Sequence, residues 1–335
     1  MAHEFTICAG TVGSGIWYSA NSGERWKRAK MELPFFSRAG DVQVRTIAVS
    51  PHDPHVAYAG SEVGLYRTAD SGASWELLES PMTGTQIWSI AVDPVDPELI
   101  LVGTKPPAIF RSSDQGKSWD RLLAGIPEEC PIGPPRVTNL VIDPLNHRNV
   151  WAGVELGGVF RSRDQGDSWT RLPQLGPRES STDVHGVAIG PGSPGKVLVT
   201  TPDGLWTSSD EGQSWTLHAF AKFAERDRVS YCRGVAVKTD NPDVLFVANG
   251  NDVPGDVGAI QISRDGGRNW QRAALPVEPN STIYWFAVNP ALPDVIIANS
   301  MFGYVYVSTD GGASWNKLRR ELSEIRGLAC MPTDR

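Results

Sequence analysis

The octapeptide Thr68-Ala-Asp-Ser-Gly-Ala-Ser-Trp75 decides the fold of this chain, because six further versions of it recur along the sequence. The seven copies occupy residues 19–26, 68–75, 112–119, 162–169, 208–215, 263–270 and 308–315. Their closing tryptophans, from Trp26 to Trp315, follow one another at intervals of 44 to 55 residues. A repeat of that length is typical of one four-stranded blade of a β-propeller.

The octapeptide has a local physical role. In the copy at residues 68–75, the side chain of Asp70 can fold back onto backbone N–H groups and hold a tight turn. Gly72 permits a backbone conformation that a Cβ atom would oppose, and Trp75 supplies a large apolar surface that anchors the hairpin. Because all three positions serve the turn, we expect the repeated residues to be structural and not catalytic.

The segment around the second copy gives the strand order of one blade. Strand-forming residues separated by turn residues predict an inner strand at Val44–Val49, a second strand at His55–Ala59, a third at Gly64–Thr68 and an outer strand at Ser74–Leu78. The same order recurs after each later copy, with Ile87–Val92, Val137–Ile142, Val184–Ile189, Cys232–Val237 and Ile283–Val288 as inner strands.

The two ends of the chain complement each other. Phe5–Ala9, Gly15–Ser19 and Arg25–Ala29 supply three strands without an inner one, and Ile325–Cys330 supplies an inner strand alone. We therefore predict an all-β fold: a single seven-bladed β-propeller over residues 1–335, with four antiparallel strands per blade. Blade 1 joins residues 325–331 to residues 4–30, which closes the ring and removes open sheet edges.

The composition excludes several classes of function. The chain of 335 residues has a formal net charge of −7, which argues against nucleic acid as a partner. No stretch is long and apolar enough to span a membrane, and residues 1–10 lack the features of a signal peptide, which predicts a cytoplasmic protein. Because the cysteines, Cys8, Cys130, Cys232 and Cys330, show no metal spacing and no paired motif, we expect free thiols, no metal and no cofactor.

The octapeptide is identified as the Asp-box, or BNR repeat, of sialidase-like propellers. The blade that contains Ala48–Pro51, Ala57–Gly60 and Gly64–Trp75 resembles blades of the xyloglucan-degrading endoglucanases and of sortilin-type receptors. It is less similar to the true sialidases, which have six blades and a Phe-Arg-Ile-Pro motif that this sequence lacks. The photosystem II assembly factors of the superfamily are similar in length and blade number and carry an arginine patch. The resemblance implies either a carbohydrate ligand or a protein partner.

Connection lengths distinguish the two faces of the predicted ring. The inner-to-second-strand turns and the Asp-box turns are short and uniform, whereas the connections on the other face vary. The variable connections include Lys30–Gln43, Ala124–Arg136, Ala219–Tyr231, for which we expect a short helix, and the insertion Asn249–Gly258. Variable connections gathered on one face of a repeat protein usually mark its binding face.

One residue per blade enters each inner strand from that variable face. When the inner strands are aligned on their small apolar positions, these residues are Arg45, Trp88, Thr138, His185, Arg233, Tyr284 and Arg326. We call them the mouth ring, because they should surround one end of the central channel. The positions two residues upstream add Arg136, Asp183, Tyr231 and Glu324, and the second-to-third-strand connections add Glu62 and Glu155.

The mouth ring predicts a site for a small anionic ligand, a carboxylated sugar or a carboxylic acid. Guanidinium groups bind carboxylates in bidentate fashion, so we expect Arg45, Arg233 and Arg326 to hold the ligand charge, with Arg136 and Thr138 beside them. Trp88 and Tyr284 could stack on a sugar or aromatic ring, and Tyr231 is a further ligand-binding candidate. If the site is catalytic, hydrolysis or elimination is expected. Glu62, Glu155 or Asp183 with His185 would then transfer protons, and Tyr284 would act as an acid or support an oxyanion.

Three alternatives remain open at this stage. The arginines can instead pair with Glu62, Glu155 or Glu324 and hold blades together. The same face can dock an acidic peptide or a protein partner without catalysis. A glycoside hydrolase is the third alternative, and it needs two mouth carboxyls about 5–5.5 Å or about 6.5–9.5 Å apart.

Overall fold

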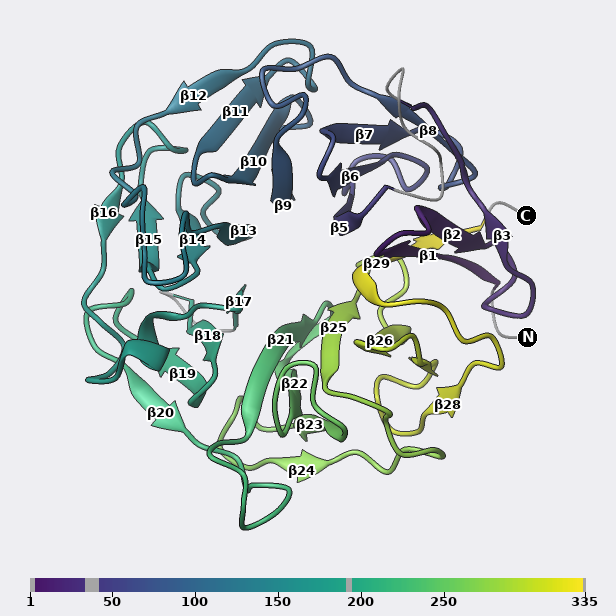
Figure 1. Cartoon of the computed structure of the whole chain (residues 1–335), viewed down its shortest axis with the longest axis vertical. Helices are drawn as coiled ribbons and strands as arrows, with labels where there is room; N and C mark the ends of the chain where they lie inside the picture. The colour runs from purple at the N-terminus through teal and green to yellow at the C-terminus, as the bar shows by residue number, and fades with distance from the viewer. Residues whose placement is uncertain (1–3, 34–41, 191–194, 334–335) are drawn as a thin grey trace.

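A computed structural model describes residues 4–33, 42–190 and 195–333, and these residues form seven antiparallel sheets arranged as blades around a central axis (Figure 1). The predicted seven-bladed β-propeller is thereby confirmed. The inner strands of blades 1 to 7 are β29 (Ile325–Pro332), β5 (Val44–Val49), β9 (Gln86–Val92), β13 (Val137–Ile142), β17 (Gly186–Ile189), β21 (Tyr231–Lys238) and β25 (Ile283–Ala287).

The remaining strands follow outward in each blade. The second strands are β1 (Phe5–Thr11), β6 (Ala57–Ser61), β10 (Leu99–Lys105), β14 (Val150–Val154), β18 (Val197–Thr201), β22 (Asn241–Gly250) and β26 (Ile296–Ser300). The third strands are β2 (Ile16–Ser19), β7 (Leu65–Thr68), β11 (Ile109–Ser113), β15 (Gly158–Ser162), β19 (Gly204–Ser208), β23 (Gly258–Ser263) and β27 (Val305–Ser308). The outer strands are β3 (Lys27–Arg28), β8 (Ser74–Leu77), β12 (Asp120–Leu122), β16 (Thr170–Arg171), β20 (Thr216–His218), β24 (Gln271–Arg272) and β28 (Asn316–Lys317).

Blade 1 closes the ring from both ends of the chain, as predicted. Strand β29 pairs with β1, and this register sets Ile7 opposite Cys330 and Cys8 opposite Ala329. Cys8 and Cys330 therefore lie diagonally on neighbouring strands, and both are free thiols. The sequence did not predict strand β4 (Lys30–Met31), which leaves blade 1 and pairs in parallel with β8 of blade 2.

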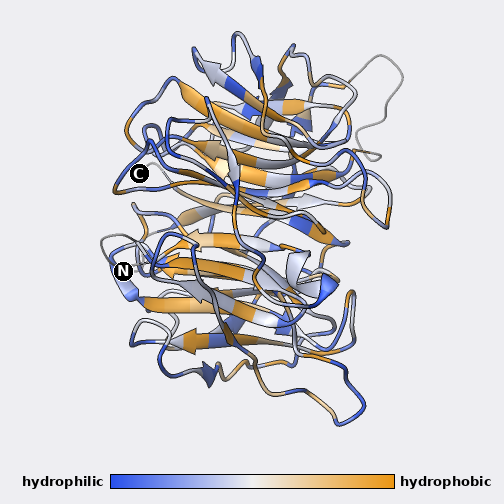
Figure 2. Cartoon of the chain, turned by 90° about the vertical axis from the view of Figure 1, so that its left-hand side faces the viewer, coloured by the Kyte–Doolittle hydropathy of each residue, from blue (hydrophilic) through white to orange (hydrophobic). Residues whose placement is uncertain are grey.

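The hydrophobic core lies between blades. In the described residues, seven clusters of buried apolar side chains each join two neighbouring blades. One of them packs Cys8 and Met331 of blade 1 against Tyr66 and Trp75 of blade 2. In the side view, much of the length of the strands is coloured as hydrophobic, which agrees with this packing (Figure 2). Because each interface needs both neighbours, the ring is one structural unit.

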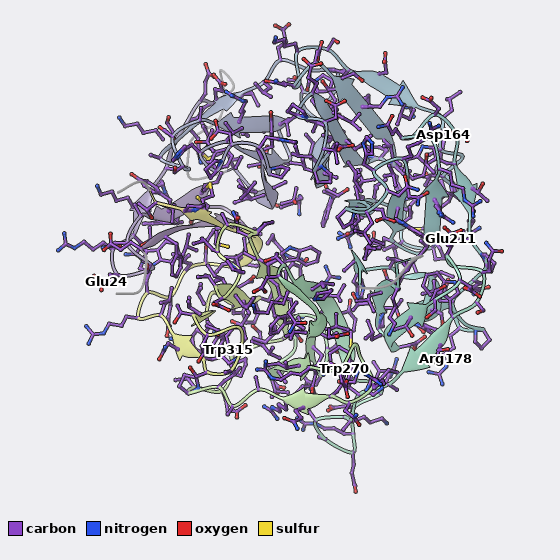
Figure 3. The ribbon with its side chains drawn as sticks, turned by 180° about the vertical axis from the view of Figure 1, so that it is seen from behind. Glu24, Asp164, Arg178, Glu211, Trp270 and Trp315 are labelled. Atoms are coloured by element: carbon purple, nitrogen blue, oxygen red, sulfur yellow. The ribbon has the colours of Figure 1, made fainter. Side chains whose placement is uncertain are left out.

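The Asp-box turns have the predicted structure. In the second copy, the Asp70 carboxylate accepts hydrogen bonds from the backbone N–H of Ser74 (2.8 Å) and from its hydroxyl (2.6 Å). Gly72 has a φ of 88°, and the indole N–H of Trp75 donates to its carbonyl (3.1 Å). Asp164 and Glu211, which belong to later boxes, lie at the outer rim of the ring (Figure 3).

The expected helix at Ala219–Tyr231 is wrong. Phe220 is buried in edge-on contact with His218 and Trp270, and Asp227 closes a turn on the backbone N–H of Ala224 (2.7 Å), so the segment is irregular. The one helical turn of the described residues is the 3₁₀ segment η1 (Glu179–Thr182). Among those residues, no helix is long and apolar enough to cross a membrane. Part of the expected connection Lys30–Gln43, residues 34–41, lies outside the described residues.

Candidate functional site

A cavity of about 250 Å³ lies at the mouth of the central channel, and all seven residues of the mouth ring line it. Below the ring, its wall continues into inner-strand side chains such as Ile47, Ile90, Leu140 and Val187. Among the described residues, the lining includes three arginines and a histidine but no aspartate or glutamate. The variable face of the propeller therefore opens onto a small hollow whose wall is cationic and aromatic.

The mouth ring is held in place by a repeated β-bulge. In blade 2, Val44 pairs with Ser61 and Thr46 with Gly60, so Arg45 is an extra residue in its strand. The same interruption of the register contains Trp88, Thr138, Arg233, Tyr284 and Arg326. His185 immediately precedes β17. A bulge re-aims a side chain out of the regular alternation, which brings one residue per blade to the mouth.

Glycines on the second strands mark the position of these bulges in the sequence. Gly10, Gly60, Gly103 and Gly153 lie where a Cβ atom would come within about 2.7 Å of the next blade's inner strand. In blade 2, for example, a Cβ on Gly60 would lie 2.5 Å from a methyl group of Ile87. The glycine near the end of the second strand in blades 1 to 4 is the signal that would have predicted their bulges.

Arg233 and Arg326 both hold the hydroxyl of Tyr284. Nη2 of Arg233 donates to Oη of Tyr284 at 2.6 Å, and Nη1 of Arg326 donates to the same oxygen at 2.7 Å. Burial opposes the phenolate form, but the two guanidinium groups outweigh it and lower the pKa of Tyr284 to about 8. Tyr284 therefore ionises at a lower pH than an ordinary tyrosine.

Two further guanidinium groups contact the indole ring of Trp88. The Cζ atoms of Arg45 and Arg136 lie 4.5 Å and 4.1 Å from the ring centroid, a favourable cation–π separation. Nη2 of Arg45 donates to the amide oxygen of Gln43 at 2.9 Å. Burial lowers the pKa of Arg45, and burial together with the charge of Arg233 lowers the pKa of Arg136 to about 10. The crowded positive charges therefore destabilise one another.

The predicted acidic residues are engaged behind the ring. The carboxylate of Glu62 accepts the backbone N–H of Gln43 (2.7 and 2.8 Å). Glu155 forms an ion pair with Arg136, and Glu324 with Arg326. If the three ring arginines all paired with mouth glutamates, they would serve only to hold blades together. Among the described residues, Arg326 forms such a pair, with Glu324, and Arg45 and Arg233 do not. Arg45 and Arg233 instead donate to the neutral oxygens of Gln43 and Tyr284.

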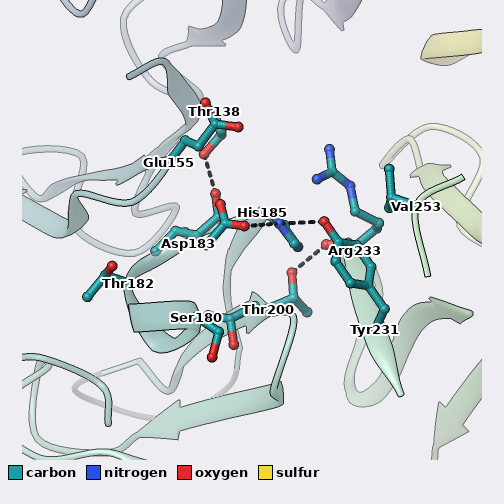
Figure 4. A network of polar contacts seen from close by, with 12 residues as sticks. Thr138, Glu155, Ser180, Thr182, Asp183, His185, Thr200, Tyr231, Arg233 and Val253 are labelled. Atoms are coloured by element: carbon teal, nitrogen blue, oxygen red, sulfur yellow. Dashed lines mark hydrogen bonds and ion pairs between the residues drawn. The ribbon is translucent and has the colours of Figure 1, made fainter. Parts of the chain in front are cut away.

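Both ring nitrogens of His185 have polar partners, and Asp183 and Tyr231 lie on either side of this residue in Figure 4. Nδ1 lies 2.6 Å from the carbonyl oxygen of Cys232, and Nε2 lies 3.1 Å from the Asp183 carboxylate and 3.0 Å from Oη of Tyr231. Burial and the charge of Arg233 lower the pKa of His185, although Asp183 opposes this shift. Nδ1 donates to the Cys232 carbonyl, because a carbonyl oxygen can only accept. The predicted proton transfer by His185 would have to displace one of these contacts.

Its two neighbours are suited to fixing that ring. Burial raises the pKa of Tyr231 to about 12, which keeps the phenol protonated as a donor. Burial opposes the charge of Asp183, but His185 and the nearby arginines outweigh it and lower the pKa of this carboxyl. Asp183 is therefore ionised near neutral pH, which does not suit the general acid of a glycosidase.

Two further candidates, Thr138 and Cys232, are hydrogen-bonded or buried. The hydroxyl of Thr138 donates to the carbonyl of Val184 at 2.7 Å, so it presents no free donor to the cavity. Cys232 is buried, and burial raises the pKa of its thiol. In the described part of the chain, no group of three or more His, Cys, Asp or Glu side chains is placed to hold a metal ion.

Larger hollows occur at the outer edge of blades 5 to 7. One of about 610 Å³ lies beside Trp315 and Arg272, and one of about 450 Å³ lies beside Phe220 and Trp270. The first includes the Asp265 carboxylate, which its own Asp-box turn engages through Asn269 (2.6 Å). These hollows lie on the outer strands and not at the channel.

The family model for the BNR/Asp-box repeat matches residues 261–272 and 306–317. Xyloglucanase Xgh74A of Acetivibrio thermocellus is 30% identical over 142 residues, which covers 34% of this chain and 16% of that protein. Together with the seven blades, these similarities define the chain as a BNR-type β-propeller.

Solved structures share the fold. The GH74 xyloglucanase of Xanthomonas campestris superimposes with a TM-score of 0.69 at 18% identity, over 99% of this chain and 53% of that one. YCF48 of Cyanidioschyzon merolae has a TM-score of 0.57 at 16% identity, over 82% of this chain and 84% of its own. This chain spans about 16% of the curated xyloglucanase and about half of the solved one, and its similarity to the solved structures is one of fold.

Proposed function

We propose that the channel mouth binds a small carboxylate. The observation that carries this proposal is the cavity wall, which in the described residues contains Arg45, Arg233 and Arg326 and no acidic side chain. Arg45 and Arg233 donate to neutral oxygens, so their positive charges are not matched by a hydrogen-bonded carboxylate. A ligand carboxylate supplies that charge and forms hydrogen bonds about twice as strong as neutral ones.

The arrangement favours carboxylate binding over glycoside hydrolysis. A two-carboxylate mechanism needs both acids at the substrate, whereas Glu62, Glu155 and Asp183 are outside the cavity lining. The sequence similarity to a xyloglucanase supports a carbohydrate ligand. That support is limited to the matched segment, because this chain covers only 16% of the curated relative. A neutral carbohydrate would leave the charges of the arginines in this wall unmatched.

If the bound acid reacts, the class we propose is hydrolysis or elimination, with Tyr284 as the proton-transferring group. Tyr284 lines the cavity, and its oxygen accepts hydrogen bonds from two guanidinium groups. Those groups stabilise the phenolate, which can then take a proton from a ligand.

A second candidate function is the docking of an acidic protein segment on the same face. YCF48 bound to a D1 peptide superimposes with a TM-score of 0.55 at 18% identity and covers 82% of both chains, so a propeller of this size serves peptide binding elsewhere. Few large apolar side chains are exposed on the described connections at the mouth. Leu123 and Ile132 lie on the connection that precedes blade 4, Val277 lies on the one that precedes blade 7, and Phe302 lies within blade 7. They do not form the apolar rim that a docking surface would need, so the small-molecule site is preferred.

Calorimetric titration of the full chain distinguishes the candidates. Each carboxylate is paired with an uncharged analogue: butyrate with butyramide, and glucuronate with glucose. At least one carboxylate should bind and its analogue should not, and Arg45→Met should weaken binding about tenfold or more. Arg111→Met is the matched control, because Arg111 pairs with Asp167 (2.7 Å) at an Asp-box, and it should leave the affinity unchanged.

Two outcomes would overturn the proposal. If no carboxylate binds at millimolar concentration, the cavity is not an anion site. If an acidic peptide binds and the small carboxylates do not, docking replaces it.

A further inference from the structure

The wall of the mouth cavity is divided into two unlike halves. Arg233, Tyr284, Arg326 and Arg45 come from four consecutive blades, 6, 7, 1 and 2. Trp88, Thr138 and His185 come from the remaining blades, 3, 4 and 5. The positive charges of the ring therefore occupy one continuous arc, and the three ring residues opposite, the neutral arc, are uncharged. The guanidinium of Arg136, which contacts Trp88, is outside the cavity lining.

The polar groups of the neutral arc are already used. The indole N–H of Trp88 donates to the amide oxygen of Gln86 (3.2 Å), the Thr138 hydroxyl donates to the Val184 carbonyl (2.7 Å), and both nitrogens of His185 are occupied. A ligand hydroxyl on this side would lose its hydration without gaining a partner, which costs about 1–3 kcal/mol per group. Such a wall disfavours the many hydroxyl groups of a sugar.

Below the neutral arc, the cavity wall is aliphatic. Ile90 of blade 3, Leu140 of blade 4 and Val187 of blade 5 line it, each exposing only 5–8% of its surface. Ser89 and Asn139 also line this half. The Ser89 hydroxyl donates to the Val137 carbonyl (2.8 Å), which leaves the amide of Asn139 for a polar substituent. This half is therefore suited to a hydrocarbon body with at most one polar substituent.

We propose that the ligand is an amphipathic monocarboxylate with a short apolar body, and not a polyhydroxylated sugar acid. Its carboxylate contacts the arginine arc of blades 6, 7, 1 and 2, and its hydrocarbon part fills the aliphatic wall of blades 3 to 5. The cavity of about 250 Å³ restricts it to a small molecule. This inference rests on the proposed function, since it names the class of carboxylate that the same cavity binds.

A homologous series tests the inference. Acetate, butyrate and hexanoate carry the same charge and differ only in hydrocarbon length, and glucuronate is the polyhydroxylated comparison. Calorimetry or ligand-observed NMR at pH 7 on the full chain should give an affinity that rises about fourfold per added methylene until the wall is covered. Hexanoate should bind more tightly than glucuronate.

Two matched variants locate the effect. Val187→Thr places a hydroxyl in the aliphatic wall without changing its volume, and should weaken hexanoate binding several-fold while acetate binding stays constant. Val199→Thr is the control, because Val199 is paired with Val187 across the sheet but does not line the cavity. Ile90→Val is a milder second probe in case both threonine variants unfold, and should weaken hexanoate about fourfold.

Each outcome bears on a different claim. An affinity that does not rise with chain length, or glucuronate binding tighter than hexanoate, overturns the amphipathic ligand and leaves the carboxylate site standing. Equal effects of Val187→Thr and Val199→Thr would also overturn it. If none of the four acids binds, the proposed function fails together with this inference.

Discussion

The outer edge of the propeller and the channel mouth use the same residue type in opposite ways. At the edge, Arg111 pairs with Asp167 and Arg161 with Glu211, both at 2.7 Å, and each carboxylate belongs to the Asp-box of the next blade. At the mouth, Arg45 and Arg233 donate to neutral oxygens instead. An arginine neutralised by the neighbouring blade stabilises the ring, whereas an arginine left charged over a cavity is available to a ligand.

The carboxylates differ between the two regions as well. In the box at residues 308–315, burial opposes the charge of Asp310, but hydrogen bonds from Ser314 and Ser308 outweigh it and lower the pKa of this carboxyl to about 2. These donors belong to its own turn, so the repeated acid is used in folding. The motif that defines the superfamily is therefore not the region where a ligand is expected.

The largest expected effect is on the free energy of unfolding, and it compares a glycine of an Asp-box with a glycine of a mouth-side connection. In Gly72→Ala, the new Cβ atom would lie 2.3 Å from Sγ of Cys8 at a φ of 88°, and we expect the free energy of unfolding to fall by about 3 kcal/mol. Gly84 has a φ of 77° with nothing within 4 Å of an added Cβ, so Gly84→Ala should cost only about 1 kcal/mol. Urea unfolding measures both, and equal losses would contradict the assigned packing role of the box.

Loss of a mouth arginine should change binding instead. In Arg233→Met we expect carboxylate affinity to fall about tenfold to hundredfold, because charge-assisted hydrogen bonds contribute about 1.5–3 kcal/mol. The free energy of unfolding should change by less than about 1 kcal/mol, since removing this guanidinium leaves no hydrogen-bonded carboxylate behind. Arg161→Met is the matched edge variant and should show the reverse pattern, lowering stability at unchanged affinity. If both variants changed the same property, the distinction between the regions would be lost.

The pH dependence of binding should follow Tyr284. Arg233, Arg326 and Arg136 face this phenol and lower its pKa to about 8, so raising the pH creates a phenolate that competes with the ligand for the same guanidinium groups. Carboxylate affinity should fall about tenfold between pH 7 and pH 9 as the phenol ionises, and Tyr284→Phe should abolish this dependence. An unchanged profile in the phenylalanine variant would contradict the assignment.

The same ionisation affects stability with the opposite sign. The pKa of Tyr284 is lower in the folded chain than the ordinary tyrosine value of about 10 in the unfolded chain. The folded state should therefore gain stability as the pH rises from about 8 to about 10, and lose that gain as the pH falls back through 8. Tyr284→Phe, followed by urea unfolding across this range, should lack the gain.

The smallest expected effect concerns the box carboxylate. The first box carries Asn21 in place of aspartate, and its amide oxygen accepts the backbone N–H of Arg25 at 2.9 Å. Asp310→Asn keeps this kind of bond, so the free energy of unfolding should fall by less than about 1 kcal/mol, with no change in carboxylate affinity. A loss as large as that of Gly72→Ala would mean that the charge of the box, and not its turn geometry, is essential.

The fold was predictable from the sequence because each blade repeats the same local structure, the Asp-box turn. Gly72 and Trp75 define a turn whose structure depends only on nearby residues, and their recurrence counts the blades. The mouth ring was predictable for a related reason. The bulge falls at the same place in successive inner strands, so one alignment offset locates the side chain at the mouth in every blade.

The contacts within the site were not predictable, because they depend on the reach of long side chains. Sequence gave no reason for Glu155 to pair with Arg136 and not with Arg233, or for Arg45 and Arg136 both to contact Trp88. The irregular segment at Ala219–Tyr231 differs from its predicted helix because tertiary packing of Phe220 outweighs local helix propensity.

The most direct test of the account is to locate a bound carboxylate by anomalous scattering from crystals soaked with 6-bromohexanoate. The account predicts the carboxylate within hydrogen-bonding distance of Arg45, Arg233 or Arg326, and the bromine beside Ile90 or Val187. Density confined to the outer hollow beside Trp315 and Arg272, with an empty channel mouth at saturating ligand, would contradict it.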